Sequence, residues 1–288
     1  MISPRILIPL LLVPFALAGC GAVTSAGGSS SGATPSGISH PTGADDVVIQ
    51  VTSDGGYVPL EVTLRAVPQF TLYGDGTVIV PGPVVMKYPG PAIYPLRTFT
   101  LSEPEVQALL TAVKDAGLLE AAAPDYGDMG SVGVSDQATT TLLVNADGAS
   151  IRRSAYALAF ESNGSRLTDA QARARRALAG FINDLPMPTT DAAYTPARLA
   201  VYVMPVQGDL QMGARPAVWP LETDLATAGT KLPDWADHRC IAVDGEDAQT
   251  LVAALSDTNE LTQWLPRANA DIAYRLVARP LLPGEVAC

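Results

Sequence analysis

The feature that most constrains the fold of this chain is a series of short runs rich in β-branched and aromatic residues, each ended by a turn signal. Two pairs of runs are joined by an Asp-Gly dipeptide, which accepts the positive backbone angles of a tight hairpin. These pairs are 70–73 with 77–80, across Asp75-Gly76, and 138–145 with 150–157, across Asp147-Gly148. Two further runs, 47–51 and 61–67, also have strand character, and the second alternates as a half-buried strand does. Antiparallel sheets are therefore the expected framework.

The first expected helix has signals at both ends. Ser102 and Glu105 form the sequence pattern of a capping box, and a glycine follows the last apolar position. A second helix, expected over 246–255, matches the first when 101–117 is set against 243–259, with four identities. This match suggests an internal duplication, although capping and amphipathic patterning impose similar residues on any helix.

A longer helix is expected from a cap at Thr168 to about Leu185. Its apolar positions recur with helical spacing, which predicts one buried stripe. Arg173, Arg175 and Arg176 are expected to lie largely on the outward face. They could bind an anion, but a solvated basic face is the commoner outcome for such a run.

A proline-rich connector near residue 190 separates two parts of different composition. All three tryptophans and two of the three cysteines lie beyond it. Further strands are expected there, at 198–204, 239–243 and 273–278. We therefore predict an α+β fold of mainly antiparallel sheets with a few packed helices, in two subdomains. The predicted domains are 46–190 and 191–288.

The N-terminus has the parts of an export signal. A short segment with one basic residue, Arg5, precedes an eleven-residue apolar run at 6–16, which is too short to span a bilayer. Leu17-Ala18-Gly19-Cys20 follows, and this tetrapeptide resembles the lipobox of bacterial lipoproteins. The resemblance implies that 1–19 is a signal peptide and that the thiol of Cys20 is acylated, for example with palmitate. Two or three acyl chains, at roughly 0.8 kcal/mol per buried methylene, would anchor the chain stably.

Residues 20–45 are expected to form the lipidated cysteine and a disordered tether. Glycine, serine, threonine, alanine and proline dominate there, so the segment cannot bury a core. A coil of this length has an end-to-end distance of about 25 to 30 Å. His40 lies within it, which leaves His238 as the histidine expected in the folded part. The predicted location is the cell membrane, lipid-anchored and facing the extracytoplasmic side.

The net charge of the chain limits the classes of partner that it is expected to bind. The chain has 18 basic and 29 acidic side chains, a net charge of −11. Removal of Arg5 with the signal peptide leaves 17 basic against the same 29 acidic, a net charge of −12. Such acidity disfavours nucleic acid as a partner. It also disfavours adhesion of the folded body to anionic lipid, so we expect membrane contact through the anchor alone.

Motifs for catalysis and metal binding are missing from the sequence. It has no Gly-x-Ser-x-Gly elbow, phosphate-cradling glycine loop, paired-histidine metal motif or Cys-x-x-Cys. We therefore predict no catalytic residue, no metal and no cofactor. The loop from Asp125 to Asp136, which also holds Asp128, has a composition compatible with a hard cation, but turn chemistry explains its aspartates and glycines better.

The remaining two cysteines predict a disulfide. Cys240 and Cys288 are the thiols left once Cys20 is acylated, and the expected compartment is oxidising. The bond would close a 49-residue loop at the C-terminus.

The segment 81–95 concentrates apolar residues between five prolines. Prolines limit its freedom, so it is expected to be an extended loop that either packs on its own sheet or meets a partner. If it meets one, Met86, Tyr88 and Tyr94 are the expected contacts, because they offer adaptable and aromatic anchors. The partner would be an envelope protein or a cell-wall component.

The folded part also resembles uncharacterised secreted and lipid-anchored actinobacterial proteins. The resemblance rests on the aromatic hairpin at 70–77, the Leu-Ser-x-x-Glu helix start within 101–119, the second hairpin at 139–148 and the end of the chain at 275–288. It implies a cell-envelope location and no particular activity. The predicted function is a non-enzymatic binding or structural lipoprotein; the alternative is an envelope hydrolase that uses paired carboxylates.

Overall fold

The computed structural model describes residues 37–130, 133–160, 167–190, 192–206, 215–233, 235–267 and 272–288. The predicted signal peptide, Cys20 and most of the predicted tether lie outside these ranges. Within them, no helix combines the length and apolar character that crossing a membrane requires.

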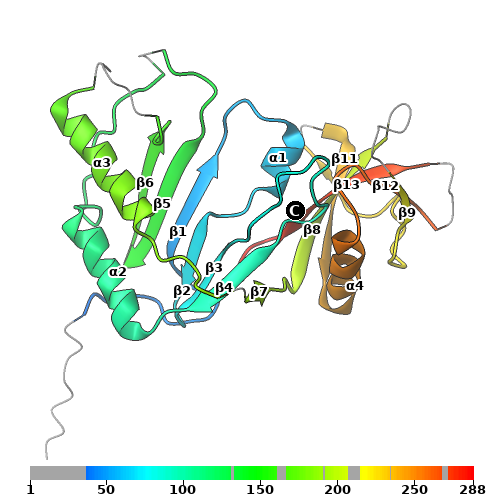
Figure 1. Cartoon of the computed structure of the whole chain (residues 1–288), viewed down its shortest axis with the longest axis horizontal. Coiled ribbons are helices and arrows are strands. Elements are labelled where there is room, and N and C mark those ends of the chain that lie inside the picture. The colour runs from blue at the N-terminus through cyan, green and yellow to red at the C-terminus, as the bar shows by residue number, and fades with distance from the viewer. Residues whose placement is uncertain are drawn as a thin grey trace, which may run out of the picture. The chain divides into compact units, whose positions relative to one another are not determined.

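The first sheet has seven strands in the order β6-β5-β1-β2-β3-β4-β7, and its recorded pairings are antiparallel (Figure 1). Its strands are β1 (Val47–Asp54), β2 (Phe70–Tyr73), β3 (Thr77–Pro81), β4 (Leu96–Thr100), β5 (Thr139–Ala146), β6 (Ala149–Tyr156) and β7 (Ala193–Tyr194). Both predicted hairpins are present, as β2–β3 and β5–β6. Gly76 ends the first turn with φ at 84°, a conformation that glycine adopts without strain.

Two capped helices cover one face of this sheet (Figure 1). In α2 (Glu103–Asp115), Ser102 and Glu105 form the predicted capping box. In α3 (Asp169–Asn183), Thr168 and Gln171 form a second one. The stripe Val106, Leu110 and Val113 of α2 packs in one core with strand residues and with Leu178 and Phe181 of α3. Local capping signals thus place both helices where the sequence predicted them.

The second sheet has six strands in the order β10-β11-β8-β13-β12-β9. They are β8 (Arg198–Pro205), β9 (Pro216–Val218), β10 (Thr230–Leu232), β11 (Trp235–Asp244), β12 (Gln263–Leu265) and β13 (Tyr274–Pro280). The β12–β9 pair is parallel and the others are antiparallel. One helix, α4 (Gly245–Ser256), packs on a face of this sheet through Ala248, Leu251 and Leu255, in a core that includes Trp219 and Trp264. The predicted α+β class with mainly antiparallel sheets is confirmed.

One predicted strand is wrong. The segment 61–67 forms a short helix, α1 (Leu60–Arg65), which buries none of its residues. The alternating pattern predicted two faces of a strand, but both edges of the neighbouring β1 are already paired, with β2 and with β5. α1 instead lies against β13 of the second sheet, where Glu61 forms an ion pair with Arg275.

The predicted end of the tether is also wrong, because the folded body begins at Gly37 rather than after Asp45. The backbone of Ile38 exchanges two hydrogen bonds with the Gln107 side chain, at 2.8 and 2.9 Å. The Ser39 amide donates to Asp147 at 3.0 Å. Side chains of α2 and of the β5–β6 turn therefore bind a segment whose composition alone predicts a flexible coil.

Segments far apart in the sequence join the two sheets. β7 pairs with β4, so the first sheet extends slightly past the predicted boundary at 190/191. In the C-terminal tail, Leu281 packs against the second sheet beside Cys240, while Leu282 packs against the first sheet beside Tyr73. Residues 37–288 form one compact unit, and the division into domains 46–190 and 191–288 stays a prediction.

The internal duplication gains no support from the strand order. The strand before α4, β11, lies directly beside β8, the first strand of its sheet. The strand before α2, β4, lies three places from β1, the first strand of the other sheet. The aligned caps differ as well, because Asp244 makes no side-chain capping bond whereas Ser102 makes a capping box.

Candidate functional site

The base of the 81–95 loop is docked on the second half of the chain rather than on its own sheet. Gly90 donates to Glu260 Oε1 at 2.7 Å, and the Glu260 amide donates back to the Gly90 carbonyl at 2.9 Å. Pro91 forms an isolated antiparallel bridge with Asn259. Ala92 is buried in the core of the second sheet. The base therefore belongs to the packing of the fold.

Arg65 of α1 fastens this base from the other side. Its guanidinium donates to Glu260 Oε2 at 2.9 Å and to the Tyr94 hydroxyl at 3.2 Å. It also lies over the Tyr94 ring, 5.1 Å from the centroid, within range of a cation–π contact. The Arg65 and Glu260 side chains are only 10% and 21% exposed, so their ion pair is shielded from solvent.

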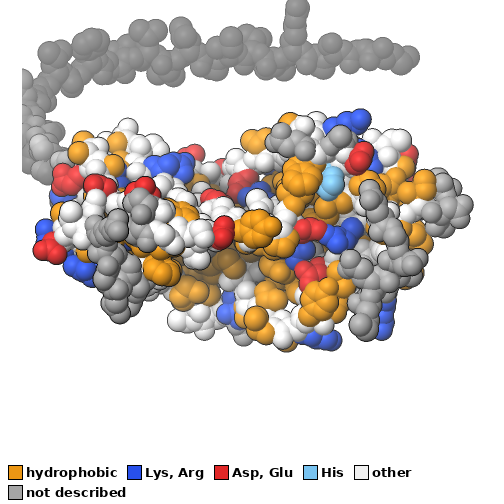
Figure 2. Space-filling model, turned by 90° about the horizontal axis from the view of Figure 1, so that it is seen from above, with side chains coloured by type: hydrophobic (Ala, Val, Ile, Leu, Met, Phe, Trp, Pro, Cys, Tyr) orange, Lys and Arg blue, Asp and Glu red, His pale blue; other side chains and the backbone are white. Residues whose placement is uncertain are grey.

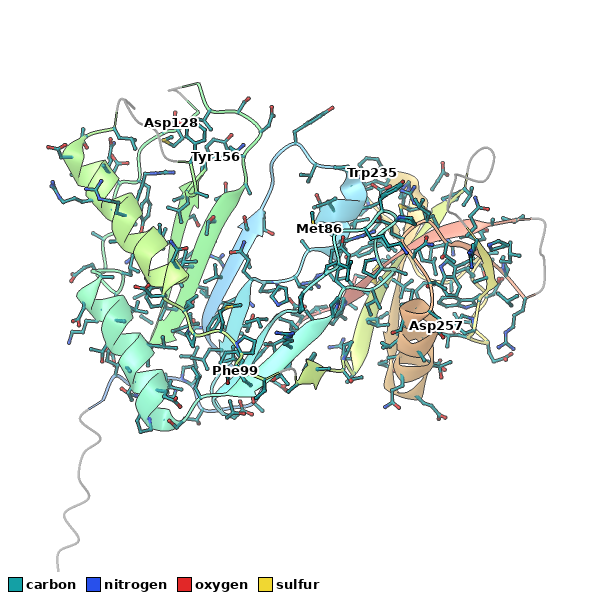
Figure 3. The ribbon with its side chains drawn as sticks, in the orientation of Figure 1. Met86, Phe99, Asp128, Tyr156, Trp235 and Asp257 are labelled. Atoms are coloured by element: carbon teal, nitrogen blue, oxygen red, sulfur yellow. A yellow bond between two sulfur atoms is a disulfide. The ribbon has the colours of Figure 1, made fainter. Side chains whose placement is uncertain are left out.

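The tip of the same loop, which we define as residues 84–88, is open to solvent. Met86, in the middle of the tip, is labelled in Figure 3. Val85 is 78% exposed, Met86 101% and Tyr88 74%. Hydrophobic side chains are also spread over the face seen in Figure 2, where they alternate with charged groups. Apolar side chains this exposed in one short segment are typical of a contact surface. The three predicted contact residues therefore separate, with Met86 and Tyr88 in the tip and Tyr94 in the docked base.

The charge around the tip differs from that of the whole chain. Residues 76–102 contain no aspartate or glutamate, although the chain has 29 acidic side chains. Lys87 lies within the tip, and Arg97 is the other basic residue of this stretch. The tip thus offers apolar groups and one cation, without a carboxylate from its own segment.

The predicted disulfide is present. Cys240 of β11 and Cys288 are joined with sulfurs 2.09 Å apart, and they are separated by 48 positions in the sequence. Cys240 is buried beside Ala200 and Leu281, so the bond holds the end of the chain against the second sheet. Neither sulfur is available as a nucleophile or a metal ligand.

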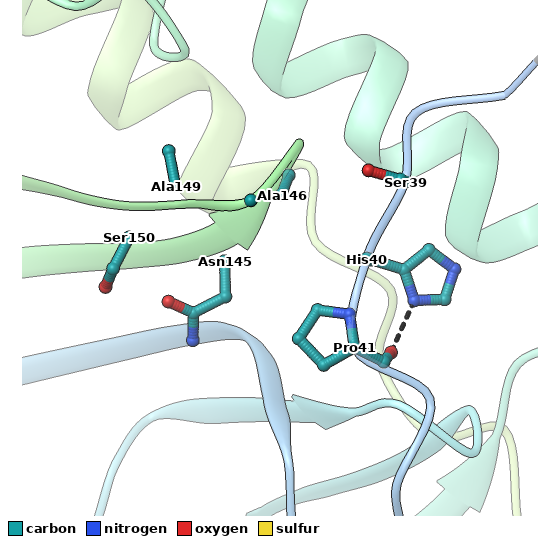
Figure 4. A pocket seen from close by; sticks show the side chains of 8 residues that line it. Ser39, His40, Pro41, Asn145, Ala146, Ala149 and Ser150 are labelled. Carbon is teal, nitrogen blue, oxygen red and sulfur yellow. Dashed lines mark hydrogen bonds between the residues drawn. The ribbon is translucent and has the colours of Figure 1, made fainter.

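His40 was expected in the tether but belongs to the folded body. It lines a pocket of 450 Å³ with Ser39, Pro41 and the β5–β6 turn (Figure 4). Its Nδ1 bonds the Pro41 carbonyl at 2.7 Å and its Nε2 lies 3.2 Å from Glu103. Hydrogen bonds from Gln107 and His40 hold the pKa of the Glu103 carboxyl below its usual value. Both ring nitrogens are engaged, so His40 fixes the incoming chain rather than activating a nucleophile.

The aspartates of the 125–136 loop accept local hydrogen bonds. Asp125 accepts hydrogen bonds from the Gln171 side chain at 2.7 Å and from the Gly127 amide at 2.8 Å, and these bonds lower the pKa of its carboxyl. Asp128 accepts from the Gly130 amide at 3.0 Å. These contacts are those of Asx turns, as turn chemistry predicts. Within the ranges the structure describes, no three His, Cys, Asp or Glu side chains gather as metal ligands would.

A paired-carboxylate hydrolase needs one carboxyl that stays protonated near neutral pH, through burial or a like charge. The described carboxyls with shifted pKa values all shift downward, and hydrogen bonds are the leading cause in each case. They are Glu103, Glu105, Asp125 and Asp224. None of these four carboxyls shifts in the direction that a catalytic acid requires, and the hydrolase alternative stays a prediction.

The expectation that Arg175 faces outward is wrong. Arg173 and Arg176 are exposed, but Arg175 is buried and donates to the carbonyls of Tyr126, Tyr156 and Ala157. Arg175 and Arg176 also line a groove of 680 Å³ between α3 and the ends of β1 and β5. Because successive residues of a helix point in different directions, Arg175 is buried while Arg173 and Arg176 are exposed. The sequence pattern did not predict this difference.

Comparison of the chain with protein-family models, curated proteins and solved structures found no match. The resemblance to bacterial lipoproteins and to actinobacterial envelope proteins therefore stays a prediction. The function has to be argued from the residues alone.

Proposed function

We propose that this chain is a lipid-anchored, non-enzymatic binding protein of the cell envelope, held on the extracytoplasmic side of the membrane through Cys20. The observation that carries the proposal is the loop 81–95, which presents an exposed apolar tip on a base fixed by buried contacts. A fixed base lowers the conformational entropy that the tip loses when it binds.

The tip also indicates the chemistry of its partner. Met86 and Tyr88 are residue types that dominate protein contact surfaces, because they supply flexible and aromatic apolar area. Lys87, in a stretch without acidic residues, would pair with a carboxylate on the other side. An apolar recess with an acidic rim, on an envelope protein or a cell-wall component, would complement this surface.

The anchor can be tested by fractionation. The parent chain should partition into membranes, and Cys20→Ala should release the body into the soluble fraction, because the acyl chains supply the membrane contact. Cys240→Ser with Cys288→Ser is a matched control that changes cysteines without touching the lipobox. Unchanged partitioning of the Cys20→Ala chain would contradict the anchor.

Partner binding can be tested separately, with the anchor intact. Met86→Ser with Tyr88→Ser should remove a complex seen when mild detergent extracts are separated by native electrophoresis. Met187→Ser changes another exposed methionine, 66% exposed, and should leave that complex in place. A complex that survives the tip variant would place the contact elsewhere.

A further inference from the structure

A groove beside α3 carries positive charge in a chain of net charge −11. One wall is a stripe of α3 that includes Ala172, Arg176, Ala179 and Ile182. At 1.5 Å rise per residue, this stripe is about 15 Å long. The opposite wall comes from the ends of β1 and β5, where the paired residues Ser53 and Thr140 face the helix side of the sheet.

The two arginines of the groove have no carboxylate partner among the described residues. Arg175 binds three backbone carbonyls through its terminal nitrogens. Burial lowers the pKa of Arg175, as expected for a cation without an anionic neighbour.

Arg176 adds a second, more accessible guanidinium. It is exposed, and it makes no hydrogen bond or ion pair within the described ranges. The described residues that line the groove include no aspartate or glutamate. Guanidinium groups bind carboxylate and phosphate oxygens through paired N–H donors.

Apolar side chains and the polar residues Gln69 and Asn183 complete the lining. Leu158, Leu167 and Ile182 contribute to it, and the Phe160 ring is 47% exposed. A ligand that fills this groove would therefore bury apolar surface while it presents an anionic group to the arginines.

We propose that the α3 groove binds an amphiphilic oxyanion, a molecule that carries a phosphate or carboxylate group beside an apolar group. The site is independent of the loop tip, so the two can be lost separately. Arg175 has a structural role in addition, because it ties Tyr126, in the 125–136 loop, and the end of β6 to α3. Arg176 has no such contact, which makes it the residue to test.

The probe is phenyl phosphate, titrated calorimetrically into the full chain in nonionic detergent. Saturable binding is expected at one site per chain. Arg176→Gln should weaken it about fivefold to tenfold, in line with the loss of one charge-assisted hydrogen bond. Arg173→Gln removes the same charge from an exposed position of α3 outside the groove lining, and it should leave the affinity unchanged.

A second variant tests the groove without changing charge. Ala179→Phe should fill it and abolish binding, while a circular dichroism melt checks that α3 still folds. Benzoate replaces phenyl phosphate to distinguish a carboxylate ligand from a phosphate, and benzyl alcohol, which lacks the anion, should bind far more weakly. Equal losses in Arg173→Gln and Arg176→Gln, equal binding of benzyl alcohol, or no saturable binding of either anion would overturn the proposal.

Discussion

The two sheets are covered in different ways. The first sheet is covered by α2 and α3, which arise from its own part of the chain and carry local capping signals. The second sheet has α4 on one face, but it also depends on the base of the 81–95 loop, on α1 and on the C-terminal tail. The first half is therefore predicted well from local patterns, whereas the second is held by contacts between residues up to about two hundred positions apart.

The difference between the two sheets predicts which substitutions should destabilise the protein most. Substitutions that release a distant segment should destabilise the second sheet. Substitutions of exposed apolar groups in the tip should not destabilise either sheet.

The largest loss is expected from removing the disulfide. Cys240→Ser with Cys288→Ser should lower the free energy of unfolding by about 4 kcal/mol, the chain-entropy value for a 49-residue loop. Urea unfolding of the two chains without reductant measures the difference. Hydrogen exchange should show the loss of protection in β11 and the tail before it reaches α2. Uniform loss in both sheets would contradict the comparison.

The next largest loss is expected at the loop base. Glu260→Ala should destabilise the protein by about 3 kcal/mol, since it leaves Arg65 without its carboxylate in a shielded site. Glu222→Ala is the matched control, because its ion pair with Arg267 has side chains 90% and 52% exposed and should contribute less than about 0.5 kcal/mol. An equal decrease in melting temperature for the two variants would mean that the Arg65–Glu260 ion pair does not stabilise the base of the loop.

A smaller loss, with a pH signature, is expected where the tail meets the first sheet. The buried Tyr73 hydroxyl donates to the Pro283 carbonyl at 3.2 Å, and Tyr73→Phe should cost about 1 kcal/mol at neutral pH. Burial, followed by Glu285, Tyr194 and Asp45, raises the pKa of Tyr73 above its usual value of 10.0.

The sign of the pH effect follows from that shift. Stability from a raised tyrosine pKa is complete below about pH 10 and falls as pH rises further, by about 1.4 kcal/mol per unit, because only the unfolded chain ionises freely. The Tyr73→Phe chain should therefore lose stability less steeply between about pH 10 and 11. Tyr194, whose pKa is also raised by burial, leaves a residual slope. Identical slopes for both chains would contradict the assignment.

The smallest effect is expected at the tip. Met86→Ala with Tyr88→Ala should change the free energy of unfolding by less than about 0.5 kcal/mol, as exposed substitutions commonly do. Adding Tyr94→Ala should lower the melting temperature by several degrees, because it removes the ring and hydroxyl that Arg65 contacts. A double variant as unstable as the triple one would show that the tip is part of the core.

Local signals explain most of what the sequence predicted correctly. The Asp-Gly dipeptides predicted the two hairpins of the first sheet, and the capping pattern at Ser102 predicted α2. The Cys240–Cys288 bond was predicted from the expectation of an oxidising compartment. The strand predicted at 61–67 is wrong because an alternating pattern does not show whether a neighbouring strand has a free edge. The prediction that 37–45 is disordered is wrong because the residues that bind this segment, such as Gln107, lie far away in the sequence.

The candidate site was predicted only in part. Met86 and Tyr88 were identified from proline spacing and apolar content; both side chains are exposed, and their contact with a partner stays a prediction. Nothing local indicated that Glu260 would hold Gly90, 170 positions away. Arg175 and Arg176 are adjacent in the sequence, yet one is buried and one exposed, a difference set by the packing of α3.

The central claim is that the tip, on its docked base, is the surface that binds a partner. A photo-crosslinking amino acid at position 86 of the full chain, activated in intact cells of the source organism, tests this directly. The same group at position 187, another exposed methionine, is the control. The account predicts one discrete adduct from position 86 and none from position 187. No adduct from 86, or the same adducts from both positions, would contradict it.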